Sequence, residues 1–153
     1  MTATRWLRIS SILAFLFALG HTLGGRKYWS PMGESQVLQQ MQTVHFDLGG
    51  TSRSYLDFYR GFGYSISVLQ VMLAVLLWQL ATRAAANAGE TRPMIAAITL
   101  ATGLCAVIAY VYILPLPALF SAALFGSLLV AYFLAGRPNR NTKRLHSAPT
   151  AAI

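Results

Sequence analysis

The amino-acid sequence predicts an all-α membrane protein, a bundle of four transmembrane helices with an amphipathic helix in its first, periplasmic loop. Of its 153 residues, 56% are hydrophobic and only 10% are charged, whereas a soluble domain is usually about one quarter charged. Long uncharged apolar stretches recur along the chain, and twelve Lys and Arg against four Asp and Glu leave a net charge of +8. This composition excludes a disordered chain and argues against a soluble enzyme, and the single cysteine excludes a disulfide framework.

Four apolar segments are each expected to form a transmembrane helix. A helix needs about 20 apolar residues to cross the hydrocarbon core, and no residue between Arg60 and Arg83 or between Arg92 and Arg137 is charged. The second gap is long enough for two helices, and the two prolines of Leu114–Pro117 predict a tight turn between them. We expect a single domain over residues 1–136, with spans at about 7–24, 60–82, 93–114 and 117–136.

The first span also has the features of a secretory signal peptide. Arg5 and Arg8 precede an apolar stretch that ends in the small residues around Gly20. Because three further spans follow, we expect this segment to be retained as the first helix of a multi-pass protein.

The distribution of basic residues predicts the orientation of the chain. With four spans, the N-terminus, the second loop and the C-terminal tail share one side, which carries eight of the twelve Lys and Arg residues. The positive-inside rule places this side in the cytoplasm of a bacterial inner membrane. Residues 137–153 are expected to form a basic, disordered cytoplasmic tail, and no motif indicates nucleic-acid binding. The eight residues are Arg5, Arg8, Arg83, Arg92, Arg137, Arg140, Lys143 and Arg144.

The first loop contains its own helix signal. Ser30 followed by Pro31 suits an N-cap with proline at the first helical position. Apolar residues then keep helical spacing as far as Phe46. We expect an amphipathic helix over about 31–46 that lies on the outer surface, followed by a turn at Asp47–Ser52.

Polar residues near the outer membrane face form a candidate ligand-binding site. Asp57, Arg60 and Tyr64 are spaced i, i+3, i+7, so they share one helix face, and Ser67 continues that face one turn deeper. His21 lies near the outer end of the first span. Ionisable groups at membrane depth are costly, and they usually face a bundle interior or a cavity.

Three interpretations of these residues are open. In the first, Asp57 pairs with Arg53 or Arg60, His21 hydrogen-bonds a neighbouring helix, and these contacts only fasten the loop to the bundle. In the second, the residues line an outward-facing pocket for a lipid, isoprenoid or quinone, with Arg60 on an anionic head group. If a reaction occurs there, a histidine acts as general acid or base beside a carboxylate, the catalytic candidates being His21, His45, Asp47 and Asp57. In the third, a metal or haem is held by His21, His45 and Asp47.

Small residues recur every fourth position in the last span, as Ala118, Ala122 and Gly126 and as Ala123, Ser127 and Ala131. Such stripes let helices approach closely in lipid. They support an alternative function, in which the chain is a non-catalytic accessory subunit of a larger membrane complex or a homo-oligomer. No P-loop, GxSxG or HExxH pattern is present, so the sequence identifies neither a reaction nor a cofactor.

Three motifs resemble those of a family of small bacterial inner-membrane proteins: GHTLGG at residues 20–25, HFD at 45–47 and SRSYLDFYRGFG at 52–63. The family has no assigned activity, so the resemblance implies a four-helix membrane fold and no reaction. The DoxX-like and sterol-isomerase-like proteins are similar to this chain only in expected architecture.

Overall fold

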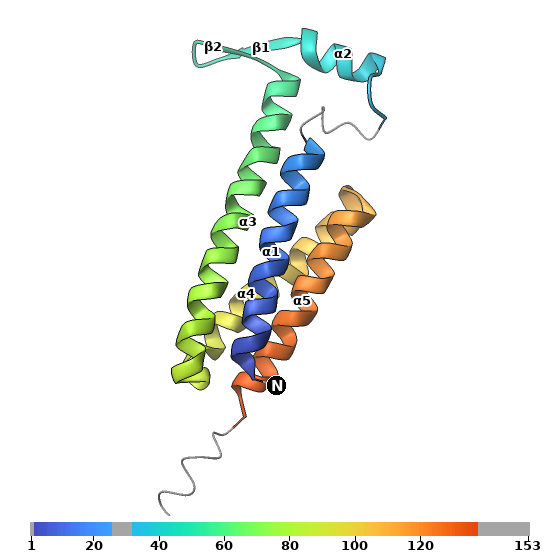
Figure 1. The fold of residues 1–153 in the computed structure, drawn as a ribbon. Helices are drawn as coiled ribbons and strands as arrows, with labels where there is room; N and C mark the ends of the chain where they lie inside the picture. The colour runs from blue at the N-terminus through green and yellow to red at the C-terminus, as the bar shows by residue number, and fades with distance from the viewer. Residues whose placement is uncertain (1, 26–31, 138–153) are drawn as a thin grey trace, which may run out of the picture.

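The computed structural model describes residues 2–25 and 32–137 and is mostly helical (Figure 1). Four helices are long and apolar enough to cross a membrane, as the sequence predicted. Figure 1 shows them side by side, with the short helix α2 and a β-hairpin beyond one end of the bundle. The elements are α1 (Ala3–Gly25), α2 (Gln36–Thr43), β1 (His45–Leu48), β2 (Thr51–Ser54), α3 (Tyr55–Ala86), α4 (Ala88–Tyr112) and α5 (Pro115–Ala135).

The long helices extend beyond the expected spans at several ends, and local capping explains why α3 begins earlier than expected. α3 begins at Tyr55 because Ser54 caps it: Ser54 Oγ accepts from Asp57 N, and Asp57 Oδ2 accepts from Ser54 N, both at 3.1 Å. This reciprocal capping box satisfies two backbone donors. At the proline-containing turn between the last two helices, α4 ends at Tyr112 and Pro115 occupies the first turn of α5.

The first loop is less helical than the sequence predicted. The expected N-cap at Ser30 and Pro31 lies outside the described residues, and α2 instead begins after Ser35, whose Oγ accepts from Leu38 N at 3.2 Å. The prediction of helix as far as Phe46 is wrong. The backbone becomes extended at Val44, and Phe46 lies in β1.

A two-residue turn replaces the longer turn expected at 47–52. β1 and β2 pair antiparallel, with Leu48 opposite Thr51. Gly49 and Gly50 connect them with φ values of 58° and 78°. Two-residue hairpin turns with positive φ at both positions match the twist of the strands, and glycine adopts this conformation without steric strain.

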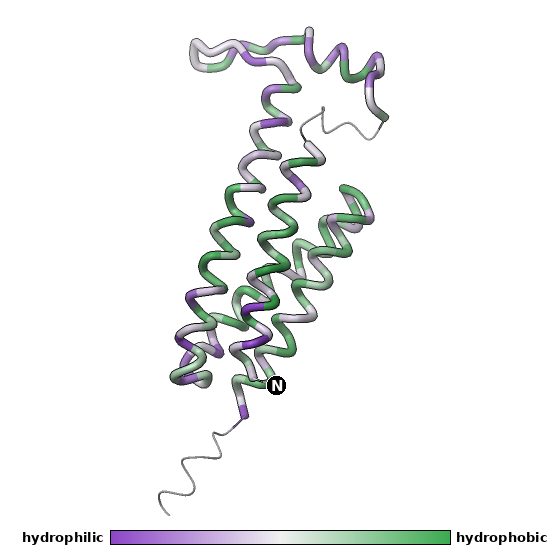
Figure 2. The backbone as a smooth tube through the Cα atoms, viewed as in Figure 1, coloured by the Kyte–Doolittle hydropathy of each residue, from purple (hydrophilic) through white to green (hydrophobic). Residues whose placement is uncertain are grey.

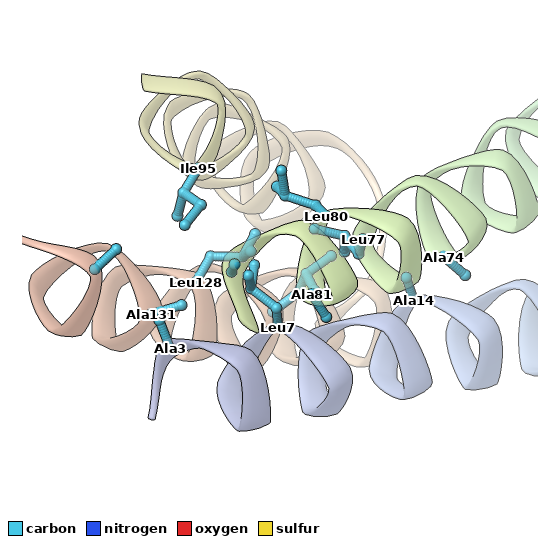
Figure 3. Packing of buried hydrophobic residues seen from close by; sticks show 13 residues of the cluster. Ala3, Leu7, Ala14, Ala74, Leu77, Leu80, Ala81, Ile95, Leu128 and Ala131 are labelled. Atoms are coloured by element: carbon cyan, nitrogen blue, oxygen red, sulfur yellow. The ribbon is translucent and has the colours of Figure 1, made fainter. Parts of the chain in front are cut away.

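The hydrophobic core lies in the half of the bundle away from the hairpin, and Figure 3 shows how its side chains pack. Leu7, Leu77, Ile95 and Leu128, one from each long helix, are fully buried there. Alanines surround them and let the helices approach closely. The most extensive helix pairs are α1 with α3 and α4 with α5, α1 also packs on α5, and α3 packs only sparsely on α4.

Buried hydroxyl groups join α1 to two other helices. Ser10 Oγ lies 2.8 Å from Ser127 Oγ of α5, and Ser11 Oγ donates to the Ala74 carbonyl oxygen of α3 at 2.6 Å. An unpaired polar group inside an apolar bundle is costly, so these contacts fix the position of α1 along both neighbours.

The small residues of α5 divide between two faces. Ala118, Ser127 and Ala131 are buried, whereas Ala122 and Ala123 are exposed. Gly103 of α4 lies close to α5, because a Cβ atom on it would stand 3.0 Å from the Phe125 ring. A Cβ at Gly126 would meet no described atom within 4 Å.

These two glycines form a matched pair. We expect Gly103→Leu to destabilise the protein by about 1–3 kcal/mol, because the new side chain overpacks against Phe125. Gly126→Leu, with open space around it, should leave stability unchanged. Thermal unfolding in one mild detergent measures both, and equal melting temperatures for the two variants would contradict the α4–α5 packing described.

Candidate functional site

The strongest candidate site is a cluster of polar side chains between α1 and α3, on the hairpin side of the core. His21 Nδ1 lies 3.2 Å from Ser67 Oγ, and Thr22 Oγ1 lies 2.8 Å from the same atom. Ser67 is buried, and His21 and Thr22 are half-buried. We call these three residues, together with Gln70, the interhelical polar cluster.

Aromatic packing fixes His21 within the cluster. The Phe17 ring, one turn before it on α1, meets the imidazole edge to face, with ring centroids 6.1 Å apart. Phe17 also stacks on Phe120 of α5 at 5.5 Å. Three helices therefore contribute to the position of one histidine.

Gln70 extends the cluster one turn deeper. It follows Ser67 by three residues on α3, and side chains three apart lie on the same helix face. Its Oε1 atom is buried and has no hydrogen-bond partner among the described residues. A buried oxygen that accepts no hydrogen bond carries its full desolvation cost, about 1–3 kcal/mol. This side of the cluster thus presents an acceptor that suits a donor group from outside the described chain.

The predicted site residues on α3 separate into different environments. Arg60 is half-buried and precedes Ser67 by two turns on the inward face, with buried Gly63 between them. Tyr64 is exposed. Asp57 is also exposed and serves as the capping residue of α3. Two of the predicted ligand-binding residues, His21 and Ser67, are within hydrogen-bond distance of each other, and Arg60 shares the inward face.

The described residues show Asp57 in a cap rather than in an ion pair. Its carboxylate accepts from Ser54 N, and Arg53 Nη1 donates to the Ser52 carbonyl oxygen at 2.8 Å. These contacts engage Asp57 and Arg53 separately, whereas the other part of the first interpretation, a hydrogen bond from His21 to a neighbouring helix, matches its contact with Ser67 of α3. The first turn of α3 also suits a negative charge because of the helix dipole.

His45 and Asp47 lie on β1 and are exposed. His45 Nδ1 is 2.9 Å from the Thr43 carbonyl oxygen, which accepts its proton, and Asp47 stands opposite Ser52 in the hairpin. Within residues 2–25 and 32–137, no three His, Cys, Asp or Glu side chains are grouped so that they could hold a metal ion. The ligand set of the third interpretation is therefore not assembled there.

Sequence reasoning did not identify two contributors. No role was assigned to Thr22 from the sequence, although this hydroxyl residue directly follows His21 and could have been recognised from that position. Ser54 was not recognised as a cap, although Ser54 and Asp57 fit the Ser-x-x-Asp pattern that precedes an apolar helix. The relative register of α1 and α3, which brings His21 to Ser67, leaves no such signal in the sequence.

A cluster of aromatic side chains connects the hairpin to α3. Phe46 of β1 lies 5.3 Å from Tyr55 and 5.8 Å from Phe58, and Phe58 lies 4.8 Å from Phe62, all measured between ring centroids. Beside it, a shallow groove is lined by Arg53, Asp57, Phe58, Gly61, Phe62 and Ser65. This groove does not include the interhelical polar cluster.

No protein-family model, curated protein or solved structure matches the chain.

The role of Asp57 can be tested separately from that of the cluster. We expect Ser54→Ala to destabilise the protein by about 1 kcal/mol, because it removes the N-cap. Asp57→Ala should add little once Ser54 is lost, because both substitutions break the same capping box. A double-mutant cycle by thermal unfolding measures this coupling. Additive effects of the two substitutions would argue against the capping box, and Asp57 would then again be a candidate for ligand binding.

Proposed function

We propose that the protein spans a membrane four times and binds a membrane-soluble amphiphile, such as a lipid, isoprenoid or quinone, at the interhelical polar cluster. The observation that carries the proposal is the buried Oε1 atom of Gln70 without a partner in the described chain, next to the His21–Ser67 contact. Mostly apolar sites with a few convergent polar groups are typical of such ligands.

The surface of the bundle supports membrane insertion. Figure 2 shows hydrophobic residues along most of the four long helices, with hydrophilic residues mainly toward the helix ends. Several large apolar residues are about two thirds exposed, including Val68 (68%), Leu100 (66%) and Leu119 (65%). Soluble proteins rarely expose apolar patches this extensive, whereas lipid covers them without cost. The first loop then belongs at the outer surface, with α2 lying along the interface.

The polar cluster determines the kind of ligand that we propose. Ligand atoms near Gln70 Oε1 must donate a hydrogen bond, so the head group carries a hydroxyl or an amide; a ligand of the quinone class meets this requirement only in its reduced quinol form. Ser67 Oγ beside it is already engaged by Thr22 Oγ1 and His21 Nδ1, so we assign the contact with the ligand to Gln70 Oε1. Half-buried Arg60, nearer the hairpin on the same helix face, suits an anionic substituent. The apolar tail of the ligand lies among the aliphatic side chains of the helices.

The charge distribution supports an orientation with the start of α1, the α3–α4 turn and the end of α5 in the cytoplasm. These three segments meet at one end of the bundle (Figure 1). Five of the described arginines belong to them, whereas Arg53 and Arg60 lie toward the hairpin. The five are Arg5, Arg8, Arg83, Arg92 and Arg137. Arg140, Lys143 and Arg144 lie outside the described residues.

Phosphatase fusions test this orientation in a bacterial host. Alkaline phosphatase inserted between Gly49 and Gly50 should be active, because the exposed hairpin turn then lies in the periplasm. The same enzyme fused after Arg137 should be inactive. The reverse pattern would overturn the orientation, and activity at neither position would contradict the four-span insertion itself.

A pair of glutamine variants tests ligand binding. Gln70→Leu should raise the melting temperature of the delipidated protein, because it removes a buried acceptor without breaking a hydrogen bond. The same variant should lose the ligand that co-purifies with the wild type, as measured by native mass spectrometry from membranes.

Gln79→Leu is the matched control, since Gln79 is exposed on the same helix. It should keep both the ligand and the wild-type stability after delipidation. Retention of ligand by Gln70→Leu, or equal loss in both variants, would contradict the proposed site.

The alternative function, an accessory subunit, is favoured by one observation. Ala122 is exposed, and a Cβ atom on the neighbouring Gly126 would meet no described atom within 4 Å, so a partner helix could approach closely here. The Gly126→Leu variant therefore also distinguishes the two functions. If the chain docks on a larger complex through this face, the variant should dissociate from it while keeping its own fold.

A further inference from the structure

A hollow of about 640 Å³ lies at the opposite end of the bundle from the interhelical polar cluster. It is bounded by the start of α1, the turn between α3 and α4 and the end of α5, which Figure 1 shows close together. Its charged lining consists of Arg92 and Arg137, and the first residues of α4, Ala88 and Gly89, line it as well. We call this hollow the basic pocket.

Arg92 is held in place by contacts with the face of its guanidinium group. The Cζ atom lies 4.4 Å from the centroid of the Tyr132 ring. On Gly136, a Cβ atom would come within 3.0 Å of the same Cζ, so only glycine admits the group this closely. Stacking of this kind uses the planar face and leaves the five N–H donors at the edge. Among the described residues these donors form no hydrogen bond.

The start of α4 adds backbone donors to the same pocket. Asn87 is the N-cap, but its side chain makes no capping bond, and its Nδ2 instead donates to Glu90 Oε1 at 2.6 Å. The amides of the first turn therefore lack a side-chain acceptor, and the helix dipole places partial positive charge there. Gly89 has no side chain to shield these amides from an approaching anion.

The charge at this end of the protein is strongly positive. Arg92 and Arg137 line the pocket, and Arg5, Arg8 and Arg83 belong to the same end. Glu90 is the only acidic residue there, because the other three of the chain precede or begin α3. Those three are Glu34, Asp47 and Asp57.

We propose that the basic pocket binds the phosphate group of an anionic phospholipid, an inference that rests on the membrane insertion proposed above but not on the amphiphile site. Guanidinium edges and helix N-terminal amides together match the oxygens of a phosphate. The pocket lies at the cytoplasmic end of the proposed orientation, where head groups of the inner leaflet are negatively charged. Apolar helix surface beside it accommodates the acyl chains.

Titration with phosphatidylglycerol, followed by native mass spectrometry in a mild detergent, tests the proposal. Each arginine near an anionic surface contributes enough for roughly a fivefold change in affinity. We therefore expect Arg137→Gln to weaken phosphatidylglycerol binding about fivefold and Arg92→Gln with Arg137→Gln to weaken it about 30-fold. Phosphatidylcholine should bind wild type and variants alike.

Gly89→Asp separates binding from folding. An aspartate in the first turn of α4 interacts favourably with the helix dipole, so the melting temperature should stay the same or rise. The added negative charge should nevertheless repel the phosphate and lower the affinity for phosphatidylglycerol. A variant that is folded and still binds the lipid as tightly as the wild type would overturn the site.

Two controls complete the design. Arg5→Gln with Arg83→Gln removes the same charge from exposed residues that do not line the pocket, and it should change the affinity much less. An equal loss in this control would reduce the effect to general surface charge and overturn the proposal. Millimolar inorganic phosphate should not compete with the lipid; effective competition would identify a soluble phosphate ligand instead. Gln70→Leu should leave phosphatidylglycerol binding unchanged, which keeps a failure of this site distinct from a failure of the amphiphile site.

Discussion

The packing of α1 between α3 and α5 is the interaction on which the rest of the structure depends. Hydroxyl contacts of Ser10 and Ser11 set its position along both neighbours, and the same helix then carries His21 and Thr22 to Ser67. Because α3 and α4 share little contact of their own, α1 also links the α1–α3 pair to the α4–α5 pair. One helix thus determines both the core and the polar cluster.

The four long helices follow from the sequence because charge is excluded from long segments, and no other common fold requires that pattern. The elements that the sequence placed wrongly are short and depend on single contacts. α2 stops before Val44 because extended pairing of β1 with β2 competes with helix there. Two adjacent glycines signal this hairpin, but only one of the flanking strands carries apolar residues, so the alternation that identifies a strand is weak.

The candidate site was predictable in composition but only partly in arrangement. Helical spacing places Arg60 and Ser67 on one face of α3, but Asp57 and Tyr64, which the same spacing groups with them, are exposed. It does not tell whether a carboxylate such as Asp57 points into the bundle or caps the helix, because both roles suit the first turn. Contacts between helices depend on their relative translation, which is set by small side chains and hydroxyl groups distributed over the whole interface.

The depth of the polar cluster along α3 bears on the route that the proposed ligand would take. Ser67 lies twelve residues beyond the first residue of α3, which at 1.5 Å per residue is about 18 Å along the axis. The hairpin and α2 stand beyond the start of that helix (Figure 1). If the protein binds a hydrophobic molecule as we propose, that molecule would enter sideways between the helices, directly from the bilayer in which it is dissolved.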